Sequence, residues 1–174
     1  MSGLRLASKL QIGGKHTINT DTVGGDHVKK EIVWPHGHQA AAMICIMLDA
    51  EFIWLGEYGP RRGINRILEA LDRFQVKATF FAPGIFAETY PEQLKEIAEA
   101  GHEIALHGYR HEDFGGLSKE QQQSVLNRGA KAIEQTIGRM PVGFRLPEGG
   151  CTEETHTLIQ QAGFLYDNSF FDHD

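Results

Sequence analysis

Two histidines and one aspartate stand where they could bind a divalent metal ion. Asp49 follows the apolar run AAAMICIML (40–48), His107 ends the run HEIALH (102–107), and His111 follows four residues later. Both runs are typical of strands buried in a parallel sheet, whose carboxyl ends meet at the edge where α/β proteins place their sites. Two neutral imidazoles and a carboxylate suit a zinc-type ion and leave a position for water or substrate. We therefore predict a catalytic metal site at these three residues.

The four-residue spacing of the two histidines carries no weight by itself. The sequence contains 9 histidines in 174 residues, and this composition gives roughly 0.5 such pairs by chance. What favours a metal site is the position of HGYRHED directly after a buried strand, together with a carboxylate that closes another strand. On composition alone, exposed or hydrogen-bonded histidines remain the alternative.

Strands and helices alternate along the rest of the chain, which predicts a parallel sheet covered by helices and joined by right-handed crossovers. Capping-box pairs at Thr89 and Glu92, and at Ser118 and Gln121, predict where two of the helices begin. In chain order, we expect a strand at 40–48, a helix at 63–74, a strand at 77–83, a helix at 91–100, a strand at 102–107, a helix at 118–138, a strand at 141–145, a helix at 152–163 and a strand at 164–167.

The length fits one domain, which we place at residues 32–174 after an N-terminal arm at residues 1–31. A closed βα barrel usually needs about 200 residues or more, so the barrel predicted here looks unfinished at its C-terminal end. Three explanations stay open: the sequence is a fragment, the sheet remains open, or another chain completes it in a homo-oligomer.

Composition narrows the class of partner. The formal net charge of -6 argues against nucleic acid and anionic membranes, which attract clustered Lys and Arg. A small molecule or a glycan is the expected substrate. No stretch approaches the roughly 20 apolar residues of a membrane span, and residues 1–30 lack a secretory signal, so we expect a cytoplasmic protein.

Five motifs together resemble the polysaccharide deacetylase (NodB-homology) family, in the branch that acts on peptidoglycan sugars, allantoin or cyclic imides. In order, they are LDAEFIWLGEYGPRRG, KATFFAPG, AGHEIALHGYRHE, PVGFRLPEGG and FLYDNS, and the resemblance covers residues 32–174. It implies a distorted βα barrel that hydrolyses amide C–N bonds, chiefly N-acetyl groups of sugars, with a bound divalent metal, most often zinc. It also implies that Asp49, His107 and His111 are the metal ligands.

The resemblance assigns roles to further residues. The Arg-x-Pro motif of the family falls on Arg145 and Pro147, and Asp167 of the Tyr-Asp-x-Ser motif would pair with Arg145 and help to orient the catalytic base. An ordinary ion pair at a sheet edge is the alternative for Arg145 and Asp167. Pro147 and Trp54 are expected to line the substrate groove, although Trp54 equally fits an aromatic side chain packed over the barrel mouth.

The first strand departs from the family pattern. Its relatives carry Asp-x-Asp-Ala-Glu there, with the first Asp as general base, whereas this chain has Met47 at that position. A thioether cannot accept a proton from water. A shifted register, with Asp49 as base and Glu51 as ligand, stays open because residues two apart on a strand share a face. The general-acid histidine of the family belongs to later strands, which this sequence does not reach.

We therefore predict a metal-dependent amide hydrolase of the carbohydrate N-deacetylase type that is altered and inactive or nearly so. Three alternatives stay open: a non-catalytic relative that binds metal or glycan, a cyclic amide or imide hydrolase, and a purely structural fragment of the fold.

Overall fold

The computed structural model of the protein describes residues 38, 40–48 and 56–169. The chain divides into two units after Met43, and the elements below belong to the second, Ile44–Asp174. Within the described ranges, no helix is long and apolar enough to cross a membrane. The predicted domain boundary between residues 31 and 32 lies outside them.

The elements of this unit alternate between strand and helix, as predicted. In order, they are β1 (Cys45–Met47), the π-helical turn η2 (Gly59–Gly63), α2 (Ile64–Arg73), β2 (Thr79–Ala82), α3 (Gly84–Thr89), α4 (Pro91–Glu99), β3 (Glu103–Leu106), the 3-10 turn η3 (Phe114–Gly116), α5 (Lys119–Ile137), β4 (Gly143–Phe144), α6 (Thr155–Gln161) and β5 (Tyr166–Asp167).

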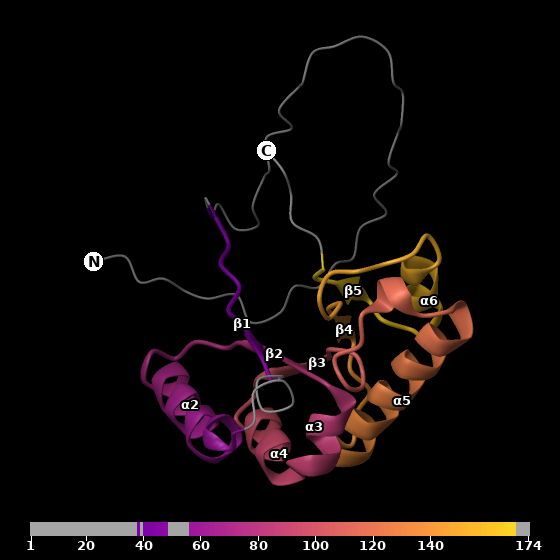
Figure 1. Ribbon diagram of the computed structural model, residues 1–174. Helices are drawn as coiled ribbons and strands as arrows, with labels where there is room; N and C mark the ends of the chain where they lie inside the picture. Colours follow the sequence, from indigo (N-terminus) through magenta and orange to yellow (C-terminus); the bar gives the residue numbers. More distant parts are fainter. Residues whose placement is uncertain (1–37, 39, 49–55, 170–174) are drawn as a thin grey trace. The chain divides into compact units, whose positions relative to one another are not determined.

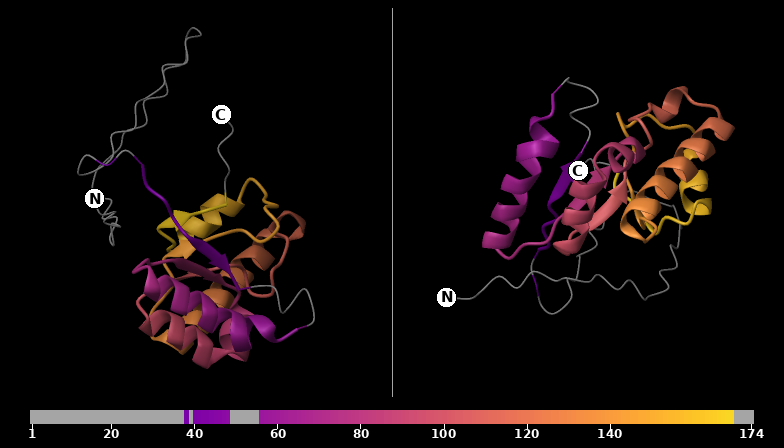
Figure 2. Two further views of the ribbon diagram at one scale, coloured as in Figure 1. Left: turned by 90° about the vertical axis from the view of Figure 1, so that its left-hand side faces the viewer. Right: turned by 90° about the horizontal axis from the view of Figure 1, so that it is seen from below.

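The five strands form one parallel sheet in the order β1-β2-β3-β4-β5 (Figure 1). Helix α2, the pair α3 and α4, and helix α5 follow one another along it in the same order (Figure 2). This confirms the predicted α/β class. Among the described residues, β1 and β5 each pair with a single strand, so the sheet is open there, as the shortfall in length led us to expect.

The register of the sheet divides its residues between two faces. Phe80 pairs with Ile104, and Leu106 pairs with Phe144, and all four are buried in the core beneath the helices. Residues that alternate with these point to the opposite side, which we call the inner face.

Polar side chains cross the amino-terminal end of the inner face. Thr79 Oγ1 donates a hydrogen bond to Glu103 Oε2 (2.8 Å), and Tyr166 Oη donates one to Glu103 Oε1 (2.9 Å). Gly143 makes room for the Tyr166 ring, because a Cβ atom there would lie 2.2 Å from it. Burial, with Glu103 beside it, raises the pKa of the Tyr166 phenol. These bonds tie strands β2, β3 and β5 together.

One predicted helix cap is present and the other is wrong. Ser118 caps α5, since its Oγ accepts from the Gln121 backbone N–H while the Gln121 side chain accepts from the Ser118 N–H. Thr89 instead ends the short helix α3, which the sequence pattern did not predict, and its hydroxyl donates back to the Ile85 carbonyl. Helix α4 begins after Tyr90 without a side-chain cap.

Helices α3 and α5 approach closely at two glycines. A Cβ atom at Gly84 would lie 2.7 Å from Gly129 Cα, and one at Gly129 would lie 2.7 Å from Leu106 Cδ1 and 2.9 Å from the Gly108 carbonyl oxygen. Both helices therefore pack directly against the segment that follows β3.

We predict that Gly129→Ala destabilises the protein by about 1–3 kcal/mol, because the added methyl group overpacks this contact. Helix propensity alone would act in the opposite direction, stabilising by about 1 kcal/mol. Urea denaturation measures the difference. Lys131→Ala, at an exposed position of the same helix, is the control and should change stability by no more than about 0.5 kcal/mol. A Gly129→Ala protein that is more stable than the parent would contradict the packing argument.

Candidate metal site

His107 directly follows β3 and is held by two hydrogen bonds. Its backbone N–H donates to the Ala82 carbonyl (3.0 Å), and its Nδ1 lies 2.9 Å from the Arg145 carbonyl oxygen. Only 3% of the residue is exposed. Because a carbonyl oxygen only accepts, Nδ1 must carry the proton, and Nε2 then presents its lone pair.

His111 is turned back toward His107 by an uncommon backbone conformation. Its φ of 65° lies in the left-handed region, which non-glycine residues rarely adopt and which clusters at functional sites. The two imidazole centroids are 5.1 Å apart, with the rings at 76°. His111 Nδ1 lies 3.5 Å from Glu148 Oε1, and Glu148 also has a positive φ, of 55°. Both turns therefore serve to bring these side chains together.

The separation of the two rings fits a shared metal ion. A ring nitrogen about 2.1 Å from zinc places its ring centroid about 3.2 Å from the ion, so two rings at a tetrahedral angle have centroids about 5 Å apart. The observed separation is 5.1 Å. Each Nδ1 also faces an oxygen, of Arg145 for His107 and of Glu148 for His111, which is how metal-binding histidines are commonly oriented.

The other predicted ligand lies outside the described residues. Asp49 belongs to the undescribed segment 49–55, as do Glu51 and Trp54. Within the described part of the chain, no group of three His, Cys, Asp or Glu side chains could hold a metal ion. The histidine pair is therefore the part of the predicted site that the structure brings together, and Asp49 as its ligand stays a prediction, as does Trp54 in the groove.

The loop between the two histidines is fixed by its own backbone. The carbonyls of Gly108 and Tyr109 accept from the first two N–H groups of α3, at Gly84 (3.0 Å) and Ile85 (2.9 Å). These helix-terminal N–H groups have no partner within the helix. The Tyr109 N–H donates to Glu112 Oε2 (2.8 Å). These contributions were not predicted, although the residues that make them lie in GYRHE, between and beside the two histidines in the sequence.

Pro147 packs against this loop. A Cβ atom at Gly108 would lie 3.0 Å from Pro147 Cγ and 2.9 Å from Glu112 Oε2, and Gly108 has a φ of 70°. The Arg-x-Pro segment therefore supports the histidine loop through Pro147 and through the Arg145 carbonyl. A role of Pro147 in contacting substrate stays a prediction.

Arg145 pairs with Asn168, and the predicted pair with Asp167 is replaced. Asp167 is opposite Phe144 in the register of β4 and β5, so it points to the helix side, whereas Arg145 shares the inner face with Asn168. Arg145 Nη1 donates to Asn168 Oδ1 (2.6 Å).

Asp167 lies in a different environment from the one predicted. It accepts a hydrogen bond from Ser169 Oγ, and its Oδ2 is 3.5 Å from His156 Nδ1 of α6. Among the described residues, the buried Oδ2 finds no hydrogen-bond partner, so its contact with His156 is longer than a hydrogen bond. The catalytic role predicted for Asp167 loses the Arg145 contact on which it rested.

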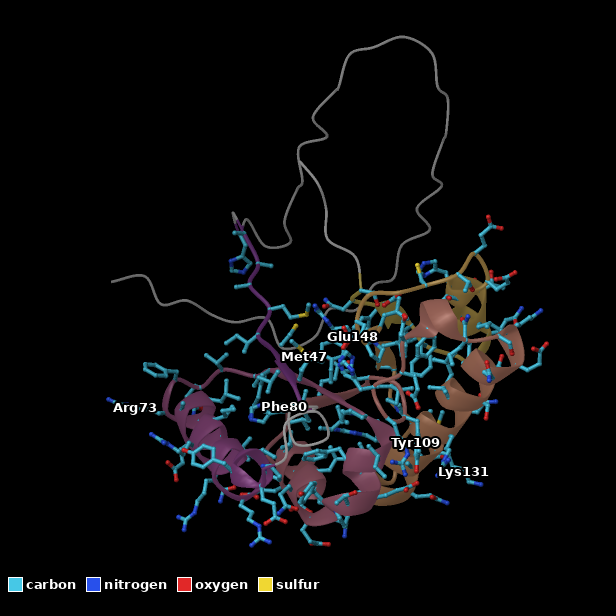
Figure 3. All side chains as sticks on the ribbon, in the orientation of Figure 1. Met47, Arg73, Phe80, Tyr109, Lys131 and Glu148 are labelled. Carbon is cyan, nitrogen blue, oxygen red and sulfur yellow. The ribbon has the colours of Figure 1, made fainter. Side chains whose placement is uncertain are left out.

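Met47 lies on β1 opposite Phe81, on the inner face, and is 40% exposed. This is the face from which His107 and Arg145 also project. Figure 3 shows Met47 and Glu148 at the same end of the sheet. A thioether at this position offers neither a proton acceptor nor a charge.

The sequence profile described as Polysaccharide deacetylase matches residues 56–166, more than half of the chain. The chain belongs to the polysaccharide deacetylase family. A peptidoglycan deacetylase-like protein of Gibberella zeae is 43% identical over 121 residues, which are 68% of this chain and 36% of that protein. A peptidoglycan deacetylase of Helicobacter pylori is 33% identical over 141 residues, 73% of this chain and 48% of that protein.

A solved structure from Mycobacterium smegmatis assigned to the polysaccharide deacetylases has the same fold. It is 38% identical, with a TM-score of 0.79, and the match covers 83% of this chain and 56% of that one. This likeness confirms the predicted NodB-type fold. The chain spans between about a third and a half of the length of the two curated relatives.

We predict that His107 is protonated at Nδ1 in the metal-free protein. This is the minor tautomer of free histidine, and the Arg145 carbonyl 2.9 Å away favours it. Two-bond ¹H–¹⁵N correlation spectra at a pH where the ring is neutral should show Nε2 unprotonated. The same protein unfolded in urea is the comparison, and its solvated histidines should show mixed tautomers. A His107 protonated at Nε2 would contradict the assignment of that nitrogen as the metal donor.

Proposed function

We propose that this polysaccharide deacetylase family member binds a zinc-type divalent ion through His107, His111 and Asp49. We further propose that the site is of the type that hydrolyses the amide bonds of N-acetylated glycans. The observation that carries the proposal is the histidine pair, with rings 5.1 Å apart and each Nδ1 facing an oxygen. Such an ion supplies Lewis acidity to water and to the amide carbonyl when it is bound.

The glycan substrate class is supported by the relatives and by charge. Both curated relatives reported above are named for peptidoglycan deacetylation. The net charge of -6 disfavours polyanions such as nucleic acids, which need clustered basic residues.

Among the described residues near the histidine pair, we assign positioning roles and the holding of one proton. The Arg145 carbonyl keeps the proton of His107 on Nδ1, and Asn168 holds the Arg145 guanidinium on the inner face. That guanidinium brings a fixed positive charge to the face that bears His107, where negative charge develops on an amide oxygen under attack.

Proton abstraction from water is the step for which the described residues provide no group at the expected position. Met47 stands where the resemblance places a general base, and a methionine cannot accept a proton. General-base catalysis contributes about 10²- to 10⁴-fold. We therefore propose that the site binds its metal but turns over slowly or not at all, and Met47 is the observation that favours a non-catalytic glycan-binding role as the second candidate.

The metal proposal predicts that His107→Ala and Asp49→Ala each weaken Zn²⁺ binding by about 100-fold or more. Loss of a residue that only contacts a ligand lowers metal affinity by about 10- to 100-fold, and loss of a ligand itself should lower it further. Isothermal titration calorimetry and metal analysis of dialysed protein measure this. His156→Ala removes an exposed histidine outside the site and serves as the control. Zinc that binds equally well to all three variants would refute the site, and Glu51→Ala tests the alternative register.

The base proposal predicts that Met47→Asp raises deacetylation by about 10²- to 10⁴-fold. The comparison uses N-acetylated chitooligosaccharides and peptidoglycan fragments with added Zn²⁺, in the longest version of the protein that the gene encodes. Met47→Leu is the matched control and should leave the rate at its parental level. Robust zinc-dependent turnover by the unmodified protein would show that Asp49, rather than residue 47, acts as base.

A further inference from the structure

The aromatic residue between the two histidines points away from them. Tyr109 is 3% exposed and lies against α5, on the side remote from Met47 and Glu148 (Figure 3). Its backbone belongs to the histidine loop, whereas its ring is buried among the helices. The side chain therefore connects the candidate site to the layer behind it.

Two charged residues hold the Tyr109 side chain. Its hydroxyl donates to Glu88 Oε2 of α3 (2.8 Å) and accepts from Arg128 Nη2 of α5 (2.5 Å). The Arg128 guanidinium carbon is also 3.7 Å from the ring centroid, a cation–π contact. One phenol thus joins two helices that are separate in sequence.

The shape of the helix contact admits this ring. A Cβ atom at Gly84 would lie 2.6 Å from Tyr109 Cδ2, so the first residue of α3 must be small. The N–H of Gly84 and that of Ile85 in turn hold the carbonyls of Gly108 and Tyr109. A shift of the Tyr109 ring would therefore move the backbone that carries both histidines.

We infer that Tyr109, held by Glu88 and Arg128, is a positioning residue that fixes the loop from His107 to Glu112. By fixing this loop, Tyr109 sets the affinity of the histidine pair for a divalent cation. That a cation binds at these histidines rests on the proposed function. Glu88 and Arg128, although exposed on the surface, thereby support the histidine loop from the layer behind it.

The test compares two tyrosines that each lose only a hydroxyl. Tyr109→Phe removes the bonds to Glu88 and Arg128, and Tyr166→Phe removes the bond to Glu103 at the far end of the sheet. Titration of the 174-residue protein with Co²⁺, followed by its visible absorption, gives the dissociation constant and reports ligand geometry. We expect Tyr109→Phe to raise that constant about tenfold, as for outer-shell residues at metal sites, and Tyr166→Phe to leave it within about twofold of the parent.

Two further variants address the charged partners. Arg128→Ala should reproduce the weaker Co²⁺ binding, and Glu88→Gln, which keeps an acceptor for the hydroxyl, should affect it less than Glu88→Ala. Equal losses in Tyr109→Phe and Tyr166→Phe, or no loss in Tyr109→Phe, would overturn the inference, because the effect would then be general stability or absent.

Hydrogen exchange separates this inference from the metal proposal. In metal-free protein, the Gly84 and Ile85 amides report directly on the loop carbonyls, and they should exchange faster in Tyr109→Phe but not in Tyr166→Phe. If the parent binds no Co²⁺, the proposed function fails, and exchange alone decides whether Tyr109 fixes the loop. Unchanged exchange at both amides in Tyr109→Phe would overturn it.

Discussion

The parallel register of the sheet decides which side chains can meet at its carboxyl edge. Pairing of Leu106 with Phe144, and of Phe144 with Asp167, commits those positions to the helix side. His107 follows Leu106 of β3, and Arg145 follows Phe144 of β4, so both side chains face the inner side. A slip of one residue would exchange the two sets, and the buried Phe80, Ile104 and Phe144 side chains oppose any such slip. Packing of the core therefore determines which side chains face the candidate site.

The histidine loop depends on the same packing. His111 and Glu148 adopt left-handed conformations, each of which costs on the order of 1 kcal/mol or more. Such turns persist only where their surroundings determine them. Here the surroundings are the α3 amides and the close approach of Gly129 to the Gly108 carbonyl. The strain is therefore stored next to the candidate ligands and held by contacts that touch neither of them.

Patterns of two kinds made most of the fold predictable. Continuous apolar runs gave β1 to β3, and periodic apolar residues with Ser118 and Gly138 at the ends gave α5. The short helix α3 was missed, because its six residues are too few to show a helical period and Thr89 resembled a cap for the next helix. The histidine pair was predictable from its place after β3. The pairing of Arg145 with Asn168 could not be predicted from the sequence. Asp167 and Asn168 are adjacent, and only the register of β4 and β5 shows which of them shares the inner face with Arg145.

The proposed metal binding and the proton transfer expected from the resemblance fall on different elements of the fold. The histidines depend on the loop after β3 and on the helices behind it, and none of those contacts involves position 47. Strand β1 carries Met47, which offers no proton acceptor where the resemblance places an aspartate. A chain without a base at position 47 can therefore keep the contacts that the loop makes through Gly108, Tyr109 and Pro147. The geometry of the histidine pair therefore does not depend on whether position 47 carries a proton acceptor.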